Sequence, residues 1–353
     1  MKEENFAFQY LFETAFSYTY SRCARTHGLN YSTFNEKMQV KIMEAVPSPL
    51  SQLGFHRFSL YKTCHKMSVI LQNSKSNLYE RQGQNMISLQ PLHEKEAFII
   101  DMDGVIYHGN TLLPGVLDFI GWMRRENKKF LFLTNSSERS PRELSTKLMR
   151  MGLDIPEGQF YTSALATASF LKTQCPGGSA YVIGEPGLMN ALYEAGFSMN
   201  DYNPDYVVFG ETRSISYEKI EHAVKLVQNG AKLVGTNSDL TGPTDAGRIM
   251  PACRALISPI TLTTGVKAYY IGKPNPLIMR HALKHLNVRR ENAAIVGDRM
   301  DTDIVAGIES ELDTVLVLSG VTDLKTMKLF PYRPAYIMHG VGDIPKDEIE
   351  QIG

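Results

Sequence analysis

The stretch Phe98-Ile99-Ile100-Asp101-Met102-Asp103-Gly104-Val105 decides how the rest of the chain is interpreted. Its three leading apolar residues, two of them β-branched, predict a short buried strand. Asp101 and Asp103 follow at once, where an open α/β sheet exposes its strand ends to ligand. The first aspartate can act as an oxygen nucleophile, and the second can exchange protons with a leaving group and with water.

This pair of aspartates is not specific by itself. A DxD sequence also binds metal in glycosyl transferases, and it can begin a calcium-binding loop. A solvated acidic turn would have the same sequence. The interpretation therefore depends on the residues that follow.

The composition is that of an ordinary globular chain. Its 353 residues, 43% hydrophobic and 21% charged, can form two or more domains. The equal numbers of basic and acidic residues, 37 of each, give no indication of a nucleic acid or membrane partner. No apolar run approaches the roughly 20 residues that cross a bilayer. The four cysteines lie far apart without a CxxC spacing, so we expect neither a disulfide framework nor a zinc site, and we predict a cytoplasmic location.

The first quarter of the chain differs from the rest. Residues 1–92 contain 10 Lys and Arg, 6 Glu and no Asp. An aromatic-rich start precedes a Ser/Asn/Gln-rich run over residues 72–90 that is typical of a linker. We predict an N-terminal extension over 1–92 that is linker-like or poorly ordered. Three interpretations stay open for it: an accessory interaction segment, a disordered tail, or a reading frame that begins too far upstream of a natural start at Met86.

A second predicted strand also ends in polar residues. The run Lys129-Phe130-Leu131-Phe132-Leu133 predicts a buried strand, and Thr134 and Asn135 follow it. Their hydroxyl and amide groups can donate hydrogen bonds to phosphate oxygens. A strand-to-helix turn with capping residues would look the same, so these two residues gain meaning only in combination with others.

Two later strand ends complete the pattern. A strand predicted over residues 269–272 is followed by Lys273, a cation that can oppose both carboxylates and phosphate. A strand predicted over residues 293–297 ends in Asp298, and Asp303 follows in the first turn of the next helix. Asp303 can complement the helix dipole, whereas Asp298 leaves its strand as Asp101 does and has no such structural explanation.

The segments between these strands indicate the fold class. Strand-like and helix-like segments alternate from residue 160 onward, which predicts parallel sheets covered on both faces. The strands are too many for one sheet, and the acidic motifs lie on either side of the block. We therefore predict a doubly wound parallel α/β core, formed by residues 93–162 and 268–353, with an inserted α/β domain over 163–267.

In this order, the sequences DMDGV, LTN, GKP and GDRMDTD resemble the four signature motifs of the haloacid dehalogenase (HAD) superfamily. The insert, with FYTSA, GE, GTN and PAC, resembles the C2-type cap of subclass IIA, which contains the NagD protein, 4-nitrophenyl phosphatases and phosphoglycolate phosphatases. The resemblance runs from Glu94 to the C-terminus and leaves residues 1–92 unexplained. The fourth motif is closer to the phosphoglycolate and nitrophenyl phosphatase form than to that of NagD, so the NagD name implies no substrate.

The resemblance implies a Rossmann-like HAD core, Mg²⁺-dependent phosphatase activity and a role for each residue. Asp101 would be the nucleophile and Asp103 the general acid and base. The transferred phosphoryl group would be held by three residues at strand ends: Thr134, Asn135 and Lys273. Mg²⁺ would be bound by the carboxylates of Asp101 and Asp298 and by the backbone carbonyl of Asp103, with Asp303 ordering the groups around the ion.

Physical chemistry favours these roles independently. Phosphoryl transfer requires in-line positioning and neutralisation of the charge on the equatorial oxygens, and Mg²⁺ with carboxylates and substrate phosphate supplies both. The substrate would be a small phosphorylated metabolite, and an edge strand of the cap could pair in a homo-oligomer. Five cap residues could face the cleft, although Tyr206 is as easily explained by packing and Arg213 by a solvated ion pair: Tyr206, Glu211, Arg213, Asn237 and Asp239.

A different class of function stays open. The chain could be a binding or regulatory protein that retains the fold without turnover and uses residues 1–92 to reach a partner. The presence of all the motif residues favours the enzyme. A dehalogenase is disfavoured because Asp103 would have no role in that reaction.

Overall fold

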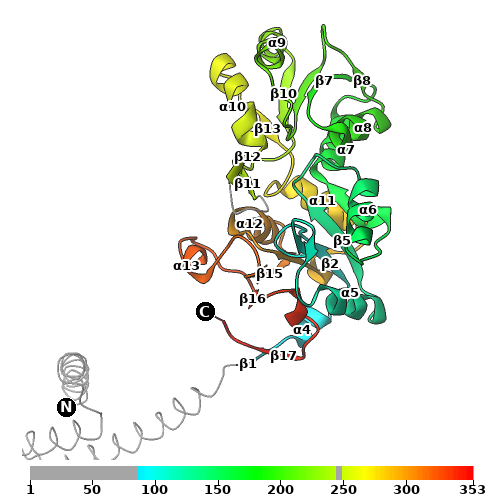
Figure 1. Ribbon diagram of the computed structural model, residues 1–353, viewed down its shortest axis with the longest axis vertical. Helices are drawn as coiled ribbons and strands as arrows, with labels where there is room; N and C mark the ends of the chain where they lie inside the picture. Colours follow the sequence, from blue (N-terminus) through cyan, green and yellow to red (C-terminus); the bar gives the residue numbers. More distant parts are fainter. Residues whose placement is uncertain (1–85, 244–248, 353) are drawn as a thin grey trace, which may run out of the picture. The chain divides into compact units, whose positions relative to one another are not determined.

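The computed structural model describes residues 86–243 and 249–352 (Figure 1). The three interpretations of the N-terminal extension concern residues 1–85 and lie outside the described residues. Residues 86–92, predicted as part of that extension, are folded, so the prediction is wrong for this short segment. Strand β1 (Met86–Ser88) pairs antiparallel with β17 (Glu348–Glu350), and helix α4 (Gln90–His93) follows. Leu89 and Leu92 are fully buried in the hydrophobic core, which explains why the segment folds.

A six-stranded, all-parallel sheet forms the larger layer, in the order β16-β15-β14-β2-β5-β6. Its strands are β2 (Ala97–Ile100), β5 (Lys129–Thr134), β6 (Phe160–Thr162), β14 (Ala293–Gly297), β15 (Asp313–Val317) and β16 (Tyr336–Met338). The central strand β2 lies between β14 and β5, with Ile100 opposite both Val296 and Phe132. The residues that follow these three strands therefore emerge together at one edge of the sheet.

Helices cover both faces of this sheet. They are α5 (Val116–Arg125), α6 (Pro141–Arg150), α7 (Ser163–Gln174), α11 (Pro276–Leu286), the short α12 (Val305–Glu309) and α13 (Leu324–Met327). Successive residues of a strand point to opposite faces, so Phe98 of β2 packs in a core with Phe119 of α5, whereas Ile99 packs in another core with Ile278 of α11. A strand buried on both faces has the continuous apolar sequence that predicted it.

Helix α6 begins with a capped first turn. The Ser140 hydroxyl accepts a hydrogen bond from Glu143 N–H, and the Glu143 carboxylate accepts one from Ser140 N–H, which completes a capping box before Pro141. Short 3₁₀ turns lie at Glu157–Gln159, Arg290–Asn292 and Val341–Asp343. A single π-helical turn, η5 (Met300–Ile304), joins β14 to α12.

A second, five-stranded parallel sheet has the order β13-β10-β9-β7-β8. Its strands are β7 (Ser179–Ile183), β8 (Ser198–Met199), β9 (Tyr206–Phe209), β10 (Lys232–Gly235) and β13 (Tyr269–Tyr270). Helices α8 (Pro186–Glu194), α9 (Tyr217–Gln228) and α10 (Cys253–Thr264) accompany these strands. The predicted fold class, a parallel α/β core with an inserted α/β unit, is confirmed.

One predicted boundary needs correction. Strand β13, predicted to belong to the core because it follows residue 267, pairs with β10 instead, with Tyr269 opposite Val234. The smaller sheet therefore extends to Tyr270. Lys273 lies in the connection that follows this edge strand.

Two small hairpins complete the fold: β3 (Tyr107–His108) with β4 (Thr111–Leu112), and β11 (Thr241–Pro243) with β12 (Ile249–Pro251). The first follows the acidic motif directly. Within the described residues, no helix combines the length and the apolar character that crossing a membrane would require.

Candidate active site

The predicted strand ends converge on one cleft of about 810 Å³. Six of the seven predicted site residues line it: Asp101, Asp103, Thr134, Asn135, Lys273 and Asp298. The seventh, Asp303, is fully buried and contacts Lys273. Residues from three strand ends of the larger sheet and from the connection after β13 thus meet in one place, although they are scattered over 200 positions of the sequence.

Lys273 lies at the centre of the site. Its Nζ is 2.5 Å from Asp101 Oδ1 and 2.7 Å from Asp303 Oδ1, and it also donates to the carbonyl of Leu133 at 3.1 Å. Only 2% of the residue is exposed. Burial lowers the pKa of the ammonium, but the two carboxylates outweigh burial and raise that pKa above its usual value. Lys273 is therefore a buried permanent cation.

Asp101 is held at the end of β2, where its backbone N–H donates to Val296 of β14 at 2.9 Å. Burial raises the pKa of its carboxyl to about 7, although the nearby Lys273 lowers it and Asp303 raises it further. Ionisation of this carboxyl is therefore costly in the protein alone, and an additional positive charge beside it would stabilise its ionised form.

Asp298 has one satisfied and one unsatisfied oxygen. Its Oδ2 accepts a hydrogen bond from the Val321 backbone at 2.6 Å, whereas its buried Oδ1 has no hydrogen-bond partner among the described residues. Burial, followed by the charge of Asp101, raises the pKa of this carboxyl well above its usual value. The carboxylate is tightly enclosed, because a Cβ on Gly104 would lie 2.6 Å from its Oδ2 and a Cβ on Gly320 would lie 2.0 Å from it.

The donor atoms fit a hard divalent cation. One carboxylate oxygen from each of Asp101, Asp298 and Asp303 lies within 4.8 Å of the other two, and Asp298 has a buried oxygen without a partner among the described residues. Carboxylate oxygens are the ligands that Mg²⁺ prefers. Asp303 differs from the other two, because its Oδ1 accepts from Lys273 and its Oδ2 accepts from the Arg299 backbone at 3.2 Å. Both oxygens of Asp303 thus accept hydrogen bonds from protein groups, which fix the Lys273 side chain and the Arg299 backbone.

Asn135 is engaged in a similar way. Its Oδ1 accepts from the Lys273 backbone N–H at 2.7 Å, and its Nδ2 donates to the Lys273 carbonyl at 2.9 Å and to Asp239 Oδ2 at 3.0 Å. The amide clamps the backbone of Lys273, so in this structure its hydrogen bonds are made to protein. The hydroxyl of Thr134 accepts from Ser136 N–H at 3.1 Å and lines the cleft.

Asp103 is the most exposed carboxylate of the group. About 48% of its side chain is accessible, and its Oδ1 lies 3.8 Å from His108 Nδ1. The backbone after it is fixed, because Gly104 N–H donates to the Tyr107 carbonyl at 2.9 Å. Asp103 thus faces the cleft from the start of the β3–β4 hairpin, where it can reach a bound ligand and solvent.

The residues proposed from the insert divide into two groups. Glu211, Arg213 and Asp239 line the cleft. Tyr206 does not line it, because it is buried in the core against Phe197, which supports the packing interpretation. Asn237 is also fully buried and donates to Glu211 rather than lining the cleft.

Glu211 links the loops of the two sheets. Its half-buried carboxyl accepts hydrogen bonds from the Ser137 hydroxyl, from Ser137 N–H at 3.2 Å and from the Asn237 amide. Burial raises the pKa of Glu211, although these hydrogen bonds act against it. Ser137 follows β5 of the larger sheet, whereas Glu211 follows β9 of the smaller one, so the contact joins the two sheets beside the cleft.

The cleft lining also contains polar residues that were not predicted, among them Tyr107, Arg139, Lys147 and Arg299. Arg299 stands inside the fourth motif and pairs with Asp301 at 2.8 Å. Its position in the sequence between Asp298 and Asp303 was the one signal that could have placed it at the cleft. Arg139 lies just before α6 and Lys147 in its last turn, and a cation at either place in the sequence looks like any solvated helix residue.

Comparison with known proteins agrees with this geometry. Residues 98–198 match the family described as haloacid dehalogenase-like hydrolase, and residues 270–344 match a second family described as HAD-hydrolase-like. Dihydroxyacetone phosphatase from Corynebacterium glutamicum is 44% identical over 248 residues, which cover 70% of this chain and 90% of the relative. The chain is a haloacid dehalogenase-like hydrolase.

Other relatives of this HAD hydrolase are also named phosphatases. Ribonucleotide monophosphatase NagD from Escherichia coli K12 is 41% identical over 246 residues, covering 70% of this chain and 96% of NagD. The solved NagD structure has a TM-score of 0.67 and covers 70% of this chain and 98% of its own. The 4-nitrophenylphosphatase of Thermotoga maritima has a TM-score of 0.70 at 31% identity, covering 72% of this chain and 98% of its own. The predicted membership of the NagD-like HAD phosphatases, which are phosphoric monoester hydrolases, is confirmed.

Proposed function

We propose that the chain is a Mg²⁺-dependent phosphatase that hydrolyses the phosphomonoester of a small metabolite through an aspartyl-phosphate on Asp101. The observation that carries this proposal is the buried contact between Lys273 and Asp101, 2.5 Å long, beside the unsatisfied Oδ1 of Asp298. A nucleophilic carboxylate, a fixed cation and a free buried ligand atom are what phosphoryl transfer to an aspartate requires. The phosphatase names of the relatives support the same reaction class.

In the first step, a carboxylate oxygen of Asp101 attacks phosphorus. A bond forms between this oxygen and phosphorus, and the bond from phosphorus to the ester oxygen breaks. Asp103 gives its proton to the departing oxygen, so the alcohol leaves neutral. Lys273 neutralises charge on the phosphoryl oxygens from one side, and the Thr134 hydroxyl is available to donate to them.

In the second step, water attacks the phosphorus of the aspartyl-phosphate. Asp103, now ionised, takes a proton from the water, and the bond between phosphorus and the Asp101 oxygen breaks. Inorganic phosphate leaves and both aspartates return to their starting states. The exposure of Asp103 suits this double role, because one carboxyl must contact the leaving group and then solvent.

The residues that would hold Mg²⁺ are the carboxylates of Asp101 and Asp298 and the backbone carbonyl of Asp103. The ion supplies positive charge against the charge of the phosphoryl group and the carboxylates. Asp303 would act through Lys273 and the Arg299 backbone, to which both its oxygens are bound.

The residues after β9 and β10 would select the leaving group. Glu211, Arg213 and Asp239 reach the cleft from the five-stranded sheet, which we propose to be the C2-type cap. The names of the relatives suggest a first panel of dihydroxyacetone phosphate, ribonucleoside monophosphates and sugar phosphates. We also propose that the protein is cytoplasmic and forms a homo-oligomer through an edge strand of the cap.

Release of nitrophenol from 4-nitrophenyl phosphate, with Mg²⁺ and with a chelator, tests the proposal. Turnover that requires Mg²⁺ and is lost in Asp101→Asn is the expected result. If the purified chain hydrolyses neither this ester nor any member of the panel at saturating Mg²⁺, the silent binding protein becomes the better interpretation. The panel then identifies the preferred leaving group by kcat/KM.

A further inference from the structure

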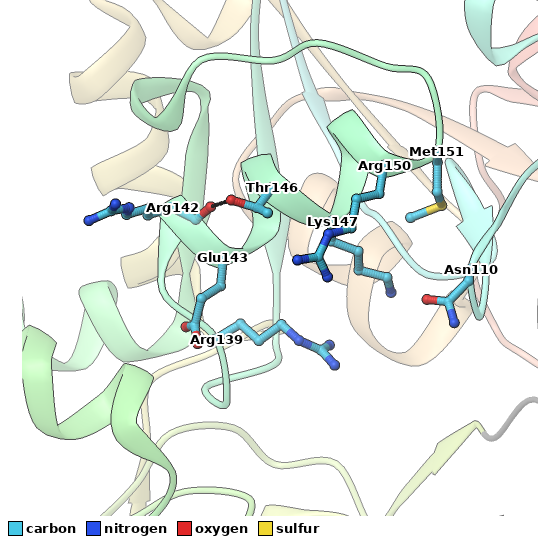
Figure 2. A pocket seen from close by; sticks show the side chains of 8 residues that line it. All are labelled: Asn110, Arg139, Arg142, Glu143, Thr146, Lys147, Arg150 and Met151. Atoms are coloured by element: carbon cyan, nitrogen blue, oxygen red, sulfur yellow. Dashed lines mark hydrogen bonds between the residues drawn. The ribbon is translucent and has the colours of Figure 1, made fainter.

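A second groove, of about 590 Å³, runs along α6 next to the active-site cleft. The two cavities share three lining residues, Asn110, Arg139 and Lys147, so they adjoin each other. Figure 2 shows the groove, with Asn110 coming from the turn between β3 and β4 and the other side chains from α6 and the residues just before and after it. A ligand whose reacting phosphate lies against Asp101 can therefore extend toward α6.

The lining of this groove is strongly basic. It contains four cations, Arg139, Arg142, Lys147 and Arg150, and a single carboxylate, that of Glu143. This carboxylate is engaged in the helix cap, where it accepts from Ser140 N–H at 2.7 Å and from the Ser140 hydroxyl at 2.8 Å. None of the ion pairs between described residues includes an arginine of the groove. The groove thus has an excess of positive charge.

The side chains are arranged as a group. In Figure 2 the charged ends of Arg139, Lys147 and Arg150 point into the same space, and the Asn110 amide faces them. Arg142 points the other way along the helix. Lys147 is also held in place, because its Nζ lies 3.6 Å from the centre of the Tyr107 ring, and Tyr107 itself lines the active-site cleft. Two guanidinium groups and an ammonium thus face one region beside the catalytic aspartates.

We propose that this groove is a binding subsite for a phosphate group other than the one hydrolysed, formed by Arg139, Lys147 and Arg150. Guanidinium groups bind phosphate through paired hydrogen bonds, and an amide such as that of Asn110 adds a donor. The inference rests on the proposed function and deepens it, because it names the substrate class as phosphomonoesters that carry a second phosphate. A phosphate on a separate molecule would satisfy the same groups, as an effector.

The test compares matched substrates that differ by one phosphate, fructose 1,6-bisphosphate and fructose 6-phosphate. The wild type should show a higher kcat/KM for the bisphosphate. The substitution Arg150→Gln should lower the ratio of the two kcat/KM values by roughly tenfold, the size expected when one charge-assisted hydrogen-bond pair is lost. Arg150→Lys, which keeps the charge and loses the fork, should restore part of it.

Arg289→Gln is the matched control. It removes an equal charge from an exposed position before β14, at the amino end of that strand, whereas the active site lies at the carboxyl ends. It should leave the ratio unchanged. A ratio that falls equally in both variants would show a general charge effect, and a ratio that falls in neither would show an ordinary solvated helix face. Either result overturns the proposal.

Titration of inorganic tripolyphosphate separates the two sources of the phosphate. Inhibition that competes with 4-nitrophenyl phosphate and weakens in Arg150→Gln supports a substrate subsite that opens into the cleft. Activation or non-competitive inhibition that is lost in the same variant supports an effector. Binding of tripolyphosphate to Asp101→Asn by calorimetry, with Arg150→Gln added, examines the groove without turnover. Loss of this binding supports the subsite even if the phosphatase proposal fails, and unchanged binding contradicts it.

Discussion

The ammonium of Lys273 lies 2.5 Å from the carboxylate of Asp101, although 172 positions separate the two residues in the sequence. The contact crosses from the connection after β13 of the smaller sheet to the end of the central strand of the larger one. The side chain of Lys273 is 3% exposed and that of Asp101 is 13% exposed, so both charges have lost most of their contact with water. This pair therefore affects both stability and reactivity.

Replacing Lys273 by Met should destabilise the protein strongly. Asp303, whose side chain is 1% exposed, would lose its buried partner, and removal of one member of a buried ion pair costs about 3–5 kcal/mol. Urea unfolding in the presence of a chelator measures the loss. Lys95→Met is the control, because its pair with the half-exposed Asp313 is worth only about 0–1 kcal/mol. Equal losses of unfolding free energy in the two variants would show that the buried pairs of Lys273 contribute no more than an exposed pair.

Asp103→Asn should slow turnover by roughly 10²–10⁴-fold if Asp103 is the general acid. The loss should depend on the leaving group, because a good leaving group needs no proton. We expect a much smaller loss with 2,4-dinitrophenyl phosphate than with an alkyl phosphate. Asp101→Asn should lose activity toward both esters alike. An Asp103→Asn variant that is equally impaired with both would show that the residue does not act as the acid.

Removal of the divalent ion should abolish activity, and Mg²⁺ should restore it. Asp298→Asn should raise the Mg²⁺ concentration for half-maximal activity by at least roughly tenfold, because even residues outside the ligand sphere change metal affinity by about 10–100-fold. The Mg²⁺-dependent rise in Tm should shrink in the same variant. Asp301→Asn is the control, since Asp301 is exposed and paired with Arg299. If both variants keep the wild-type Mg²⁺ requirement, Asp298 is not a ligand.

The pKa of Asp101 predicts how the metal-free protein responds to pH. This carboxyl has a pKa of about 7 in the folded chain, raised from 3.8 chiefly by burial. The folded state then binds more protons than the unfolded state between these two values, so stability should fall as pH rises from about 4 to 7. Tm measured in a chelator should show this fall, and Mg²⁺ should reduce it by binding the ionised carboxylate. A Tm that rises across this interval without metal would contradict a carboxyl whose pKa is raised by burial despite its pair with Lys273.

The sequence predicted well which strand ends meet at the cleft, because its signals are local. The run before Asp101 and the run before Asp298 are each apolar on both faces, and both are central strands whose ends must meet. The position of β13 could not be predicted in the same way. Two residues, Tyr269 and Tyr270, carry no pattern that identifies their neighbour, and only pairing with β10 assigns them to the smaller sheet.

Other differences have the same physical origin. Leu89 and Leu92 are the buried residues of a segment whose polar neighbours give it the composition of a linker. Arg139 and Lys147 were missed because a cation on or beside a helix acquires significance only when another element, here the β3–β4 hairpin, closes a groove over it. The burial of the two leucines and the place of the two cations in the groove both depend on packing between segments that are distant in the sequence.

Ser137→Ala tests the link between the two sheets. Glu211 is half-buried and accepts from the Ser137 hydroxyl, so deletion of this hydroxyl leaves a partly desolvated carboxyl with fewer donors, at a cost of about 1–3 kcal/mol. Ser136→Ala should cost less than about 0.5 kcal/mol, because its hydroxyl accepts only from the Glu138 backbone at 3.4 Å. Because burial raises the pKa of Glu211, the neutral Glu211→Gln should be tolerated better than Glu211→Ala. Urea unfolding of the four variants measures these differences, and a Ser137→Ala protein as stable as Ser136→Ala would show that the hydroxyl does not support the Glu211 carboxyl.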